Sequence, residues 1–387
     1  MNASSRRLWL VATILVAVST RLAAEEKKPA ASELAPKTPA GTVTSTGHWI
    51  TDGVTELTGG QPGKYIHLDE GRLLCVSGNT AFSSGDLGKT WETLSTIIRD
   101  TERISLGIGR DILRTRKGTI IVPFSNGKAK KWTWDNEILD APGAILPTYV
   151  VRSLDGGKTW LEPQKLHDIW TGDNSAIIQT STGAVLLASM KLLNDPGRHA
   201  VLTYRSEDEG ETWQPSHVLD LGGRGHHDGT MESAMLERDG RPWMLIRTNW
   251  DYFWHAFSDD DGKSWRTVYP STIDASSSPG YLRRLADGRI ALVWNRLNPQ
   301  NVLDYPKRGG IDCADRPASW HRDELSLAFS SDEGETWTDP VVIARKPGGN
   351  VSYPYMFEVE PGKLWVSASG GLRVELKVAD FVPKTTR

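Results

Sequence analysis

The chain has 387 residues, with 48 acidic and 45 basic side chains, a formal net charge of −3 and a hydrophobic fraction of 38%. This near-neutral balance excludes a general nucleic-acid-binding protein, which needs a basic face, and the ordinary apolar content excludes a wholly disordered chain. Two cysteines are too few for a disulfide framework or a four-thiolate zinc site. The composition leaves one feature unexplained, which is the presence of 16 tryptophans.

The N-terminus has the pattern of a targeting segment. The pair Arg6–Arg7 precedes an apolar run over residues 8–18, and the small residues Ala23–Ala24 follow it. This pattern predicts a secretory signal peptide over residues 1–24, because the run is shorter than the roughly 20 residues that span a membrane. An uncleaved anchor is the alternative. Residues 25–46 are rich in Pro, Ala, Ser and Thr, which predicts a flexible linker, and we expect a secreted or periplasmic mature protein that is free of the membrane.

An internal repeat organises the rest of the chain. The pattern S-x-D-x-G-x-[TS]-W occurs five times, at Ser84–Trp91, Ser153–Trp160, Ser206–Trp213, Ser258–Trp265 and Ser330–Trp337. Its Asp and Gly predict a tight turn in which the carboxylate accepts backbone N–H groups, and its Trp is expected to pack between neighbouring sheets. Because one copy falls in each successive unit, we interpret the motif as structural and not as catalytic.

Pairs of short apolar strands form a second recurring feature. The six pairs are 65–68 with 72–76, 112–113 with 119–123, 176–179 with 184–189, 234–236 with 242–247, 281–285 with 290–294, and 355–359 with 363–368. Turns such as Asp239-Gly240 and Asp287-Gly288 between them are typical of hairpins. Six four-stranded units about 50 residues apart predict an all-β fold, a six-bladed β-propeller over residues 47–387. The sixth unit is one strand short, and residues 48–57 are expected to supply that strand and close the ring.

The eight-residue repeat resembles the Asp box, or BNR repeat, of the sialidase (neuraminidase) superfamily, and the resemblance covers nearly the whole mature chain. It implies an exo-glycosidase that hydrolyses terminal, sialic-acid-like sugars from a glycan and needs no cofactor. Asp boxes also occur in propellers without activity. The alternatives are therefore an exo-glycosidase for a different sugar and a non-catalytic propeller that binds glycans.

Candidate site residues come from the end of the propeller where the innermost strands begin. Counting eight or nine residues back from the hairpin glycines reaches Arg110, Asn174, Glu232 and Tyr353. This set is polar, and a polar channel mouth favours a binding or catalytic site over a packed core.

Four residues match sialidase signatures in order and spacing: Glu232, Arg247, Arg322 and Tyr353. The resemblance implies that Tyr353 is the nucleophile, that Glu232 activates it, and that the two arginines bind the carboxylate of the sugar. A phenol is repelled less by that carboxylate than an anionic nucleophile is, and an arginine fork binds it bidentately. Structural alternatives stay open, namely a buried Glu232–Arg247 ion pair, a packed Tyr353 and a surface salt bridge of Arg322.

The sequence departs from the family in the first blade. The segment Lys64–His67 lacks the expected Arg, and the following loop 77–81 lacks the Asp that acts as general acid. Arg110 is the candidate to supply the missing guanidinium. Asp228 is the candidate general acid, with Asp173, Asp251 and Asp135 as alternatives.

Two loop segments add candidates for substrate contact. Gly225–Gly229 directly precedes Glu232, and its His227 is expected to hydrogen-bond a sugar or transfer a proton. The adjacent histidines and aspartate lack the usual ligand spacing, so we expect no metal. Trp250 belongs to an aromatic cluster after Arg247 that suits stacking on sugar rings, and packing against a neighbouring blade is the alternative.

Overall fold

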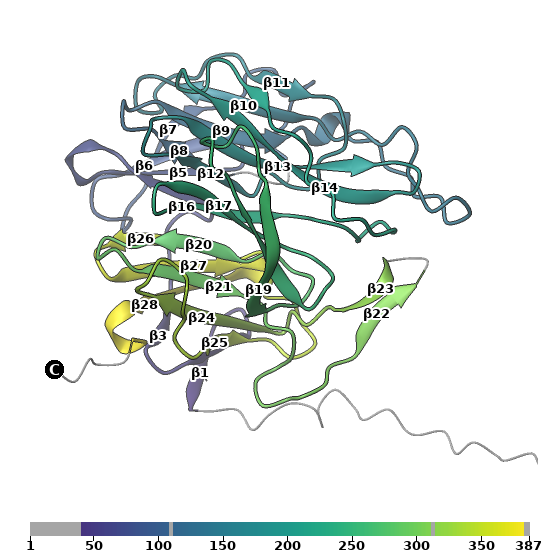
Figure 1. Ribbon diagram of the computed structural model, residues 1–387. Coiled ribbons are helices and arrows are strands. Elements are labelled where there is room, and N and C mark those ends of the chain that lie inside the picture. Colours follow the sequence, from purple (N-terminus) through teal and green to yellow (C-terminus); the bar gives the residue numbers. More distant parts are fainter. Residues whose placement is uncertain (1–39, 108–110, 311–313, 383–387) are drawn as a thin grey trace, which may run out of the picture.

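The computed structural model describes residues 40–107, 111–310 and 314–382, and these residues form the predicted six-bladed β-propeller (Figure 1). Blade one contains β4 (Lys64–His67), β5 (Leu73–Ser77), β6 (Thr80–Ser84) and β7 (Glu92–Thr96). Blade two contains β8 (Leu113–Arg114), β9 (Ile120–Ser125), β10 (Thr148–Ser153) and β11 (Gln164–His167). Blade three contains β12 (Ala176–Gln179), β13 (Val185–Leu193), β14 (Arg198–Ser206) and β15 (Gln214–Pro215).

Blades four to six follow the same antiparallel order. Blade four contains β16 (Ser233–Arg238), β17 (Arg241–Ile246), β18 (Tyr252–Phe257) and β19 (Thr267–Asp274). Blade five contains β20 (Tyr281–Arg284), β21 (Ile290–Trp294), β24 (Glu324–Ser330) and β25 (Val341–Arg345). Blade six contains β26 (Tyr355–Glu360), β27 (Lys363–Ala368), β28 (Leu372–Lys377) and β3 (Val54–Glu56). Short 3₁₀ turns lie at η1 (Asp69–Gly71), η2 (Gly127–Ala129), η3 (Ser369–Gly371) and η4 (Val378–Asp380). The first strand of each blade contacts the first strand of the next, in the closed order β4, β8, β12, β16, β20, β26 and back to β4.

The propeller closes between its N- and C-terminal segments, as the sequence predicts. However, residues 48–57 form two strands that join two different blades, where one strand was expected. Within residues 48–57, β3 pairs with β28 and completes blade six, whereas β2 (Trp49–Thr51) pairs with β25 of blade five. The preceding β1 (Gly41–Val43) pairs with β2. Residues 41–43 therefore form a strand and differ from the linker that was predicted over 25–46. The predicted signal peptide and the linker up to residue 39 lie outside the described residues.

The eight-residue motif forms the expected turn between the third and fourth strands of five blades. In the third blade, the Asp208 carboxylate accepts bonds from the Thr212 backbone N–H at 2.8 Å and from its hydroxyl at 2.6 Å. The Ser206 hydroxyl donates to Asp208 at 2.8 Å and accepts the Gly210 N–H at 2.8 Å. The other four copies repeat this pattern. The motif satisfies its own polar groups, which supports the structural interpretation.

The motif glycine is also the point where one blade touches the previous one. Gly262 has φ of +85°, and a Cβ atom placed on it would lie 2.4 Å from Leu186 of blade three. Gly88, Gly157 and Gly210 make equivalent approaches to the preceding blade. Six separate clusters of buried apolar side chains fill the gaps between neighbouring blades. Most of the hydrophobic core therefore lies between the blades, and the Asp-box glycines permit the blades to pack closely. A seventh buried cluster contains Ala141, Leu146, Trp170 and Leu192, with Trp132 and Trp134 packed against it.

Blade five carries an insertion between its second and third strands. Residues 296–323 include the hairpin of β22 (Lys307–Gly310) and β23 (Ala314–Ser319), which stands away from the blades at the right of Figure 1. This insertion, called the blade-five arm below, contacts blade four and the loop before it through ion pairs of Lys307 with Asp251 and of Asp315 with Arg224.

Within the described residues, no helix is long and apolar enough to cross a membrane.

We predict that Gly262→Ala is more destabilising than Gly240→Ala. Both glycines have a positive φ, but a Cβ atom at Gly240 meets no atom within 4 Å, whereas at Gly262 it meets the buried Leu186 side chain. Each change should cost about 1 kcal/mol because alanine disfavours a positive φ, and Gly262→Ala should add an overpacking cost of about 1–3 kcal/mol against Leu186. Urea unfolding of both variants measures the difference. Equal losses of stability would show that the close approach of the blades carries no energetic weight.

Candidate active site

The candidate site lies at the end of the ring where the innermost strands start. Glu232 directly precedes β16, Tyr353 lies two residues before β26, and Asp173 lies three residues before β12. Lys64 begins β4 and lines, with Asp173 and Tyr353, a cavity of about 560 Å³. Segments 180 residues apart in the sequence (173 and 353) therefore meet around one space.

Three of the predicted residues form a connected cluster. The Tyr353 hydroxyl donates to Glu232 Oε1 at 3.1 Å. Arg247 donates from Nη1 to Glu232 Oε2 at 2.7 Å and to the Tyr353 hydroxyl at 3.4 Å. Glu232 and Arg247 are buried, whereas Tyr353 is 40% exposed. The phenol is thus the member of the cluster that a ligand can reach.

Arg247 has its donors occupied by the protein. Besides Glu232 and Tyr353 it contacts Ser277, whose Oγ accepts from Nη2 at 3.0 Å and from Nε at 3.2 Å. Its side chain is only 2% exposed. The buried ion pair that the sequence left open is therefore present, and Arg247 holds Glu232 and Tyr353 in place.

Arg322 lies beside this cluster and is more open. Its Nη2 donates to the Ser277 carbonyl at 2.7 Å, its guanidinium lies 5.5 Å from the centre of the Tyr353 ring, and it is half-buried. Its Nε has no hydrogen-bond partner among the described residues. Burial and the like charge of Arg247 lower the pKa of Arg322 to about 10. Two adjacent guanidinium groups with one ionised carboxylate favour the binding of an anion.

The protonation states of Glu232 and Tyr353 are set by their neighbours. Burial opposes ionisation of Glu232, but the charge of Arg247, followed by backbone hydrogen bonding, outweighs it and lowers the pKa of the carboxyl. The negative charge of Glu232, and then burial, raise the pKa of the Tyr353 phenol. At neutral pH the pair therefore consists of an ionised carboxylate that accepts a hydrogen bond from a neutral phenol, an arrangement in which the carboxylate can take the phenolic proton during nucleophilic attack.

The Tyr353 backbone is held in an uncommon conformation. Its φ is +54°, and proline follows it at position 354. A non-glycine residue with positive φ persists only where the surroundings enforce it. The preceding residues are tied to the Arg322 segment, because the Val351 N–H donates to the Arg322 carbonyl at 2.8 Å. The same contacts thus orient Tyr353 and bring it near Arg322.

Asp173 lines the same cavity and carries an unusual carboxyl group. Burial and the negative charge of Glu232 raise its pKa to about 7, an effect that Lys64 and the Asn174 N–H reduce in part. Its Oδ1 atom has no hydrogen-bond partner among the described residues. A carboxyl group that keeps its proton near neutral pH can donate it to a leaving group, so Asp173 has the properties of a general acid.

The structure does not bring Asp228 into this cluster. Its carboxylate accepts the backbone N–H groups of Arg224 at 3.1 Å and of Gly229 at 2.8 Å, and it is buried within its own loop. Two other candidate acids are also occupied elsewhere. Asp251 forms an ion pair with Lys307 at 2.6 Å, and Asp135 accepts the Glu137 N–H in an exposed turn. Of the four predicted acids, Asp173 is the one that faces the Tyr353 cavity.

The remaining predicted residues have different positions. His227 packs edge-on against Trp320, with ring centres 4.9 Å apart, and Trp320 contacts Arg322 at 4.7 Å. Burial, with the charges of His226 and Arg247, lowers the pKa of His227 to about 3, so its ring is neutral and a poor proton donor at neutral pH. Trp250 packs against Trp254 of the same blade, with ring centres 5.4 Å apart. Arg110 lies outside the described residues.

Sequence reasoning missed Ser277 and Trp320. It named Asp173 only as an alternative general acid, and its counting rule selected the neighbouring Asn174 as the residue at the channel mouth. Asn174 is buried and bonds to Ser125 at 3.1 Å, so it joins blades two and three and does not line the cavity. Counting nine residues back from the hairpin glycine of this blade reaches Asn174, whereas the residue that lines the cavity is the preceding Asp173. Ser277 and Trp320 lie on irregular loops that carry no repeating pattern, so no sequence signal was available for them.

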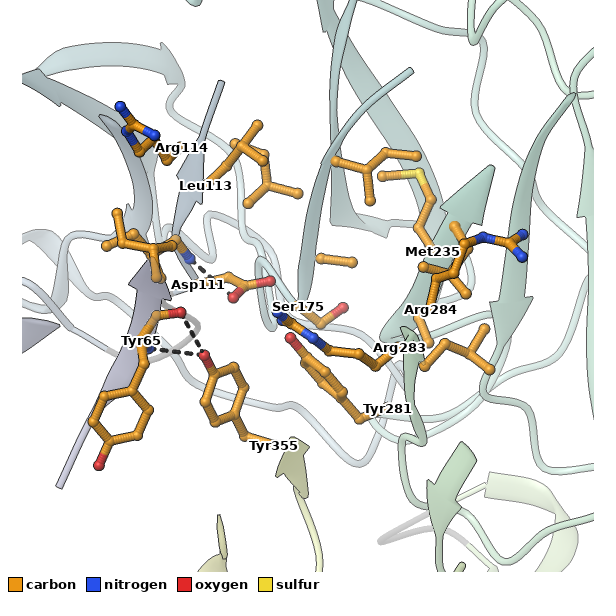
Figure 2. A pocket seen from close by; sticks show the side chains of 18 of the residues that line it. Tyr65, Asp111, Leu113, Arg114, Ser175, Met235, Tyr281, Arg283, Arg284 and Tyr355 are labelled. Carbon is orange, nitrogen blue, oxygen red and sulfur yellow. Dashed lines mark hydrogen bonds between the residues drawn. The ribbon is translucent and has the colours of Figure 1, made fainter. Parts of the chain in front are cut away.

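Below the cavity, the central channel continues between the innermost strands. A space of about 360 Å³ is lined by Asp111, Ser175, Tyr281, Arg283 and Tyr355 among others. Figure 2 shows Asp111, Tyr281, Arg283 and Tyr355 pointing toward one another across it. The Tyr355 hydroxyl accepts the Tyr65 N–H at 2.8 Å and donates to the Tyr65 carbonyl at 3.0 Å. This part of the channel combines these polar groups with aliphatic side chains such as Ile112 and Ile177, and contacts between blades six and one support it.

The structure is thus a six-bladed propeller with five Asp-box turns and a polar cluster where its innermost strands begin. A family model described as "BNR repeat-like domain" matches residues 143–366, which is more than half of the chain, and the protein belongs to that family. No curated protein matches its sequence significantly.

Similar solved structures support the fold. A protein of unknown function from Dyadobacter fermentans is 16% identical, with a TM-score of 0.57, and the match covers 84% of this chain and 99% of that one. A Hadza microbial sialidase is 17% identical, with a TM-score of 0.55 and coverage of 83% and 66%. A Trypanosoma rangeli sialidase in complex with 2,3-difluorosialic acid is 16% identical, with a TM-score of 0.53 and coverage of 88% and 57%. This chain therefore spans about two thirds or less of the length of these two sialidases.

We predict that Asp173→Asn changes the pH dependence of folding stability. The folded carboxyl keeps its proton up to about pH 7, whereas the unfolded side chain ionises near its ordinary pKa of about 3.9. The wild type therefore loses stability as the pH rises from about 4 to about 7, because the folded state binds the extra proton. The Asn variant lacks this loss, so its urea midpoint relative to the wild type should be higher at about pH 8 than at about pH 4.

Asp135→Asn, which changes an exposed carboxylate in a turn, is the control for this measurement. Its midpoint relative to the wild type should be the same at both pH values within error. If Asp173→Asn behaves like this control, the raised pKa of Asp173 is wrong.

Proposed function

We propose that this protein is an exo-acting glycosidase that hydrolyses a terminal, sialic-acid-like sugar from a glycan. The observation that carries the proposal is the hydrogen bond from the half-exposed Tyr353 hydroxyl to the buried Glu232 carboxylate at 3.1 Å. Glycosidases that act on a sugar with a carboxylate at the anomeric carbon use a tyrosine in place of an anionic nucleophile. The structural likeness to sialidases, one of them in complex with 2,3-difluorosialic acid as a covalent intermediate, supports this choice.

The roles of the residues follow from their surroundings. In the first step, the Tyr353 oxygen forms a bond to the anomeric carbon while Glu232 takes the phenolic proton. The glycosidic bond breaks, and Asp173 gives its proton to the departing oxygen of the glycan. In the second step, Asp173 accepts a proton from water, the water oxygen replaces Tyr353 at the anomeric carbon, and Glu232 returns the proton to the phenol. Arg247 stabilises the negative charge that the Glu232–Tyr353 pair carries before the attack and regains when the phenol is released.

The carboxylate of the sugar is assigned to Arg322. This guanidinium is half-buried, lies against the Tyr353 ring and stands next to a second positive charge. Lys64, at the start of β4, lines the same cavity and adds positive charge on the blade where the Arg of the family is missing. Export through the predicted signal peptide at residues 1–24, which leads to a glycan substrate outside the cytoplasm, belongs to the same proposal.

One observation favours a different terminal sugar as the second candidate. The donors of Arg247 are taken up by Glu232, Tyr353 and Ser277, so it offers no free fork to a ligand carboxylate. A neutral sugar would not need that fork. A propeller that binds a glycan without cleaving it is the third possibility, and the two experiments below separate all three.

We predict that Tyr353→Phe abolishes turnover of a chromogenic α-sialoside while leaving the fold intact. Removal of the nucleophilic oxygen should lower kcat by on the order of 10³-fold or more, because no other group replaces the covalent step. Release of the chromophore and of free sialic acid is measured for both proteins. Tyr269→Phe, at an exposed tyrosine on the outermost strand of blade four, should keep full activity. Equal turnover by wild type and Tyr353→Phe would contradict the assignment of the nucleophile.

We predict that Arg322→Met raises KM for a sialoside by about 100-fold, because it removes a charge-assisted bond to the sugar carboxylate. Arg322→Lys should recover little of that loss, since an ammonium group lacks the planar fork. A panel of neutral aryl glycosides is assayed in parallel. Hydrolysis of a neutral glycoside that Arg322→Met leaves unchanged would favour the second candidate, and binding of glycans without any product would favour the third.

A further inference from the structure

A row of aromatic rings leads away from the Tyr353 cluster across the mouth of the propeller. In order it contains Trp320, His227, His226, Trp134, Trp132 and Trp170, with successive ring centres between 4.1 and 6.2 Å apart. At its near end Trp320 lies 4.7 Å from the Arg322 guanidinium, which in turn lies 5.5 Å from the Tyr353 ring. The row is thus continuous with the candidate active site.

The rings come from four separate segments of the chain. Trp132 and Trp134 lie on the long loop between β9 and β10, and Trp170 precedes β12. The two histidines precede β16, and Trp320 follows β23 of the blade-five arm. Such a row is not the packing of one strand pair, because three blades and an insertion contribute to it. Trp170 is 9% exposed, whereas the other five rings are half-buried and so present part of their surface to solvent.

Contacts from the neighbouring blade hold the blade-two loop in place. The turn between β13 and β14 bonds to it twice, since the Asp195 N–H donates to Asp140 Oδ2 at 2.9 Å and the Gly197 N–H donates to the Leu139 carbonyl at 2.9 Å. A Cβ atom on Gly197 would lie 2.8 Å from the Trp134 ring. Trp134 is therefore supported from behind, and its ring position is fixed before any ligand arrives, which lowers the entropic cost of binding.

The chemistry of the row fits neutral sugar rings. The His227 ring is uncharged at neutral pH, and the indoles offer flat apolar faces on which the C–H face of a pyranose can stack. The indole nitrogens of Trp134, Trp170 and Trp320 are buried among the described residues, so a ligand would meet the faces and edges of the rings and not their N–H groups. The apolar C–H face of a neutral sugar ring complements such a surface, because it can stack there without burying a charge.

We propose that this row binds the neutral sugars that lie beyond the terminal residue of an oligosaccharide substrate, with Trp134 as its central stacking platform. The proposal deepens the proposed function, since these sugars form the leaving group of the reaction. Under this proposal the loop between β9 and β10 determines which oligosaccharide is bound, and the Tyr353 cluster determines which terminal sugar is cleaved. The alternative is that these indoles form a purely structural cluster under the loop. In that case the replacement of Trp134 would not change the affinity for a sugar.

The experiment measures binding and does not depend on catalysis. Neutral tetrasaccharides without a terminal acidic sugar (lacto-N-neotetraose, cellotetraose and mannotetraose) are titrated into the full-length protein by calorimetry. We expect the wild type to bind at least one of them and Trp134→Ala to bind it about tenfold more weakly, as expected for the loss of one stacked ring. Trp134→Phe should stay within about threefold of the wild type, because it keeps an aromatic face.

Two controls separate binding from folding and from turnover. Tyr269→Ala removes an exposed aromatic ring on β19 and should leave the affinity unchanged, and thermal unfolding of each variant checks that the fold persists. Binding of none of the tetrasaccharides by the wild type, or equal affinity of wild type and Trp134→Ala, would overturn the proposal. If the wild type binds but releases no sugar from sialosides or other glycosides, the row stands and the proposed hydrolysis fails.

Discussion

The buried ion pair of Glu232 and Arg247 is the interaction on which the chemistry of this site depends. A lone carboxylate in such a buried position would take up a proton to avoid the cost of an unpaired charge. Arg247, at 2.7 Å, keeps Glu232 ionised. That negative charge then raises the pKa of Tyr353 and, after burial, that of Asp173. One ion pair thus affects the protonation of a phenol and of a second carboxyl group, and the proposed hydrolysis requires both groups to hold a proton.

Closure of the ring brings these groups together. Glu232 starts blade four, Asp173 precedes blade three and Tyr353 precedes blade six, so no local segment contains the site. Their separation depends on how tightly successive blades pack, and the Asp-box glycines permit that packing by leaving room for side chains of the previous blade. The pairing of β3 with β28 then fixes blade six next to blade one. The repeated motif therefore supports the site from a distance, although it contributes no group to it.

The fold was predictable because its determinants are local and repeated, whereas the site was predictable only in part. Each hairpin and each Asp box satisfies its own polar groups, so six copies of a pattern imply six blades. Glu232 and Tyr353 could be chosen as candidates because they lie just before regular strands, eight or nine residues before the hairpin glycines. Asp228 was chosen over Asp173 because sequence does not reveal which way a loop carboxylate points; Asp228 bonds to its own loop, while Asp173 faces the cavity. Ser277 and Trp320 come from irregular loops, where no periodicity constrains the direction of a side chain.

The tryptophans show how one residue type serves both halves of this architecture. In the Asp boxes the indole closes a gap between blades, as Trp265 does when its N–H donates to Thr203 of the previous blade at 2.8 Å. On the loops, Trp132, Trp134 and Trp320 stay half-buried and lie beside one another or beside histidine rings. A motif tryptophan packs at a fixed place in its blade, whether it is buried, as Trp265 is, or half-buried, as Trp213 is, whereas a tryptophan on a loop takes no part in the packing of the blades. Tryptophan therefore serves two separate purposes in this protein. One is packing within and between the blades, and the other, on the loops, is the proposed binding of sugars.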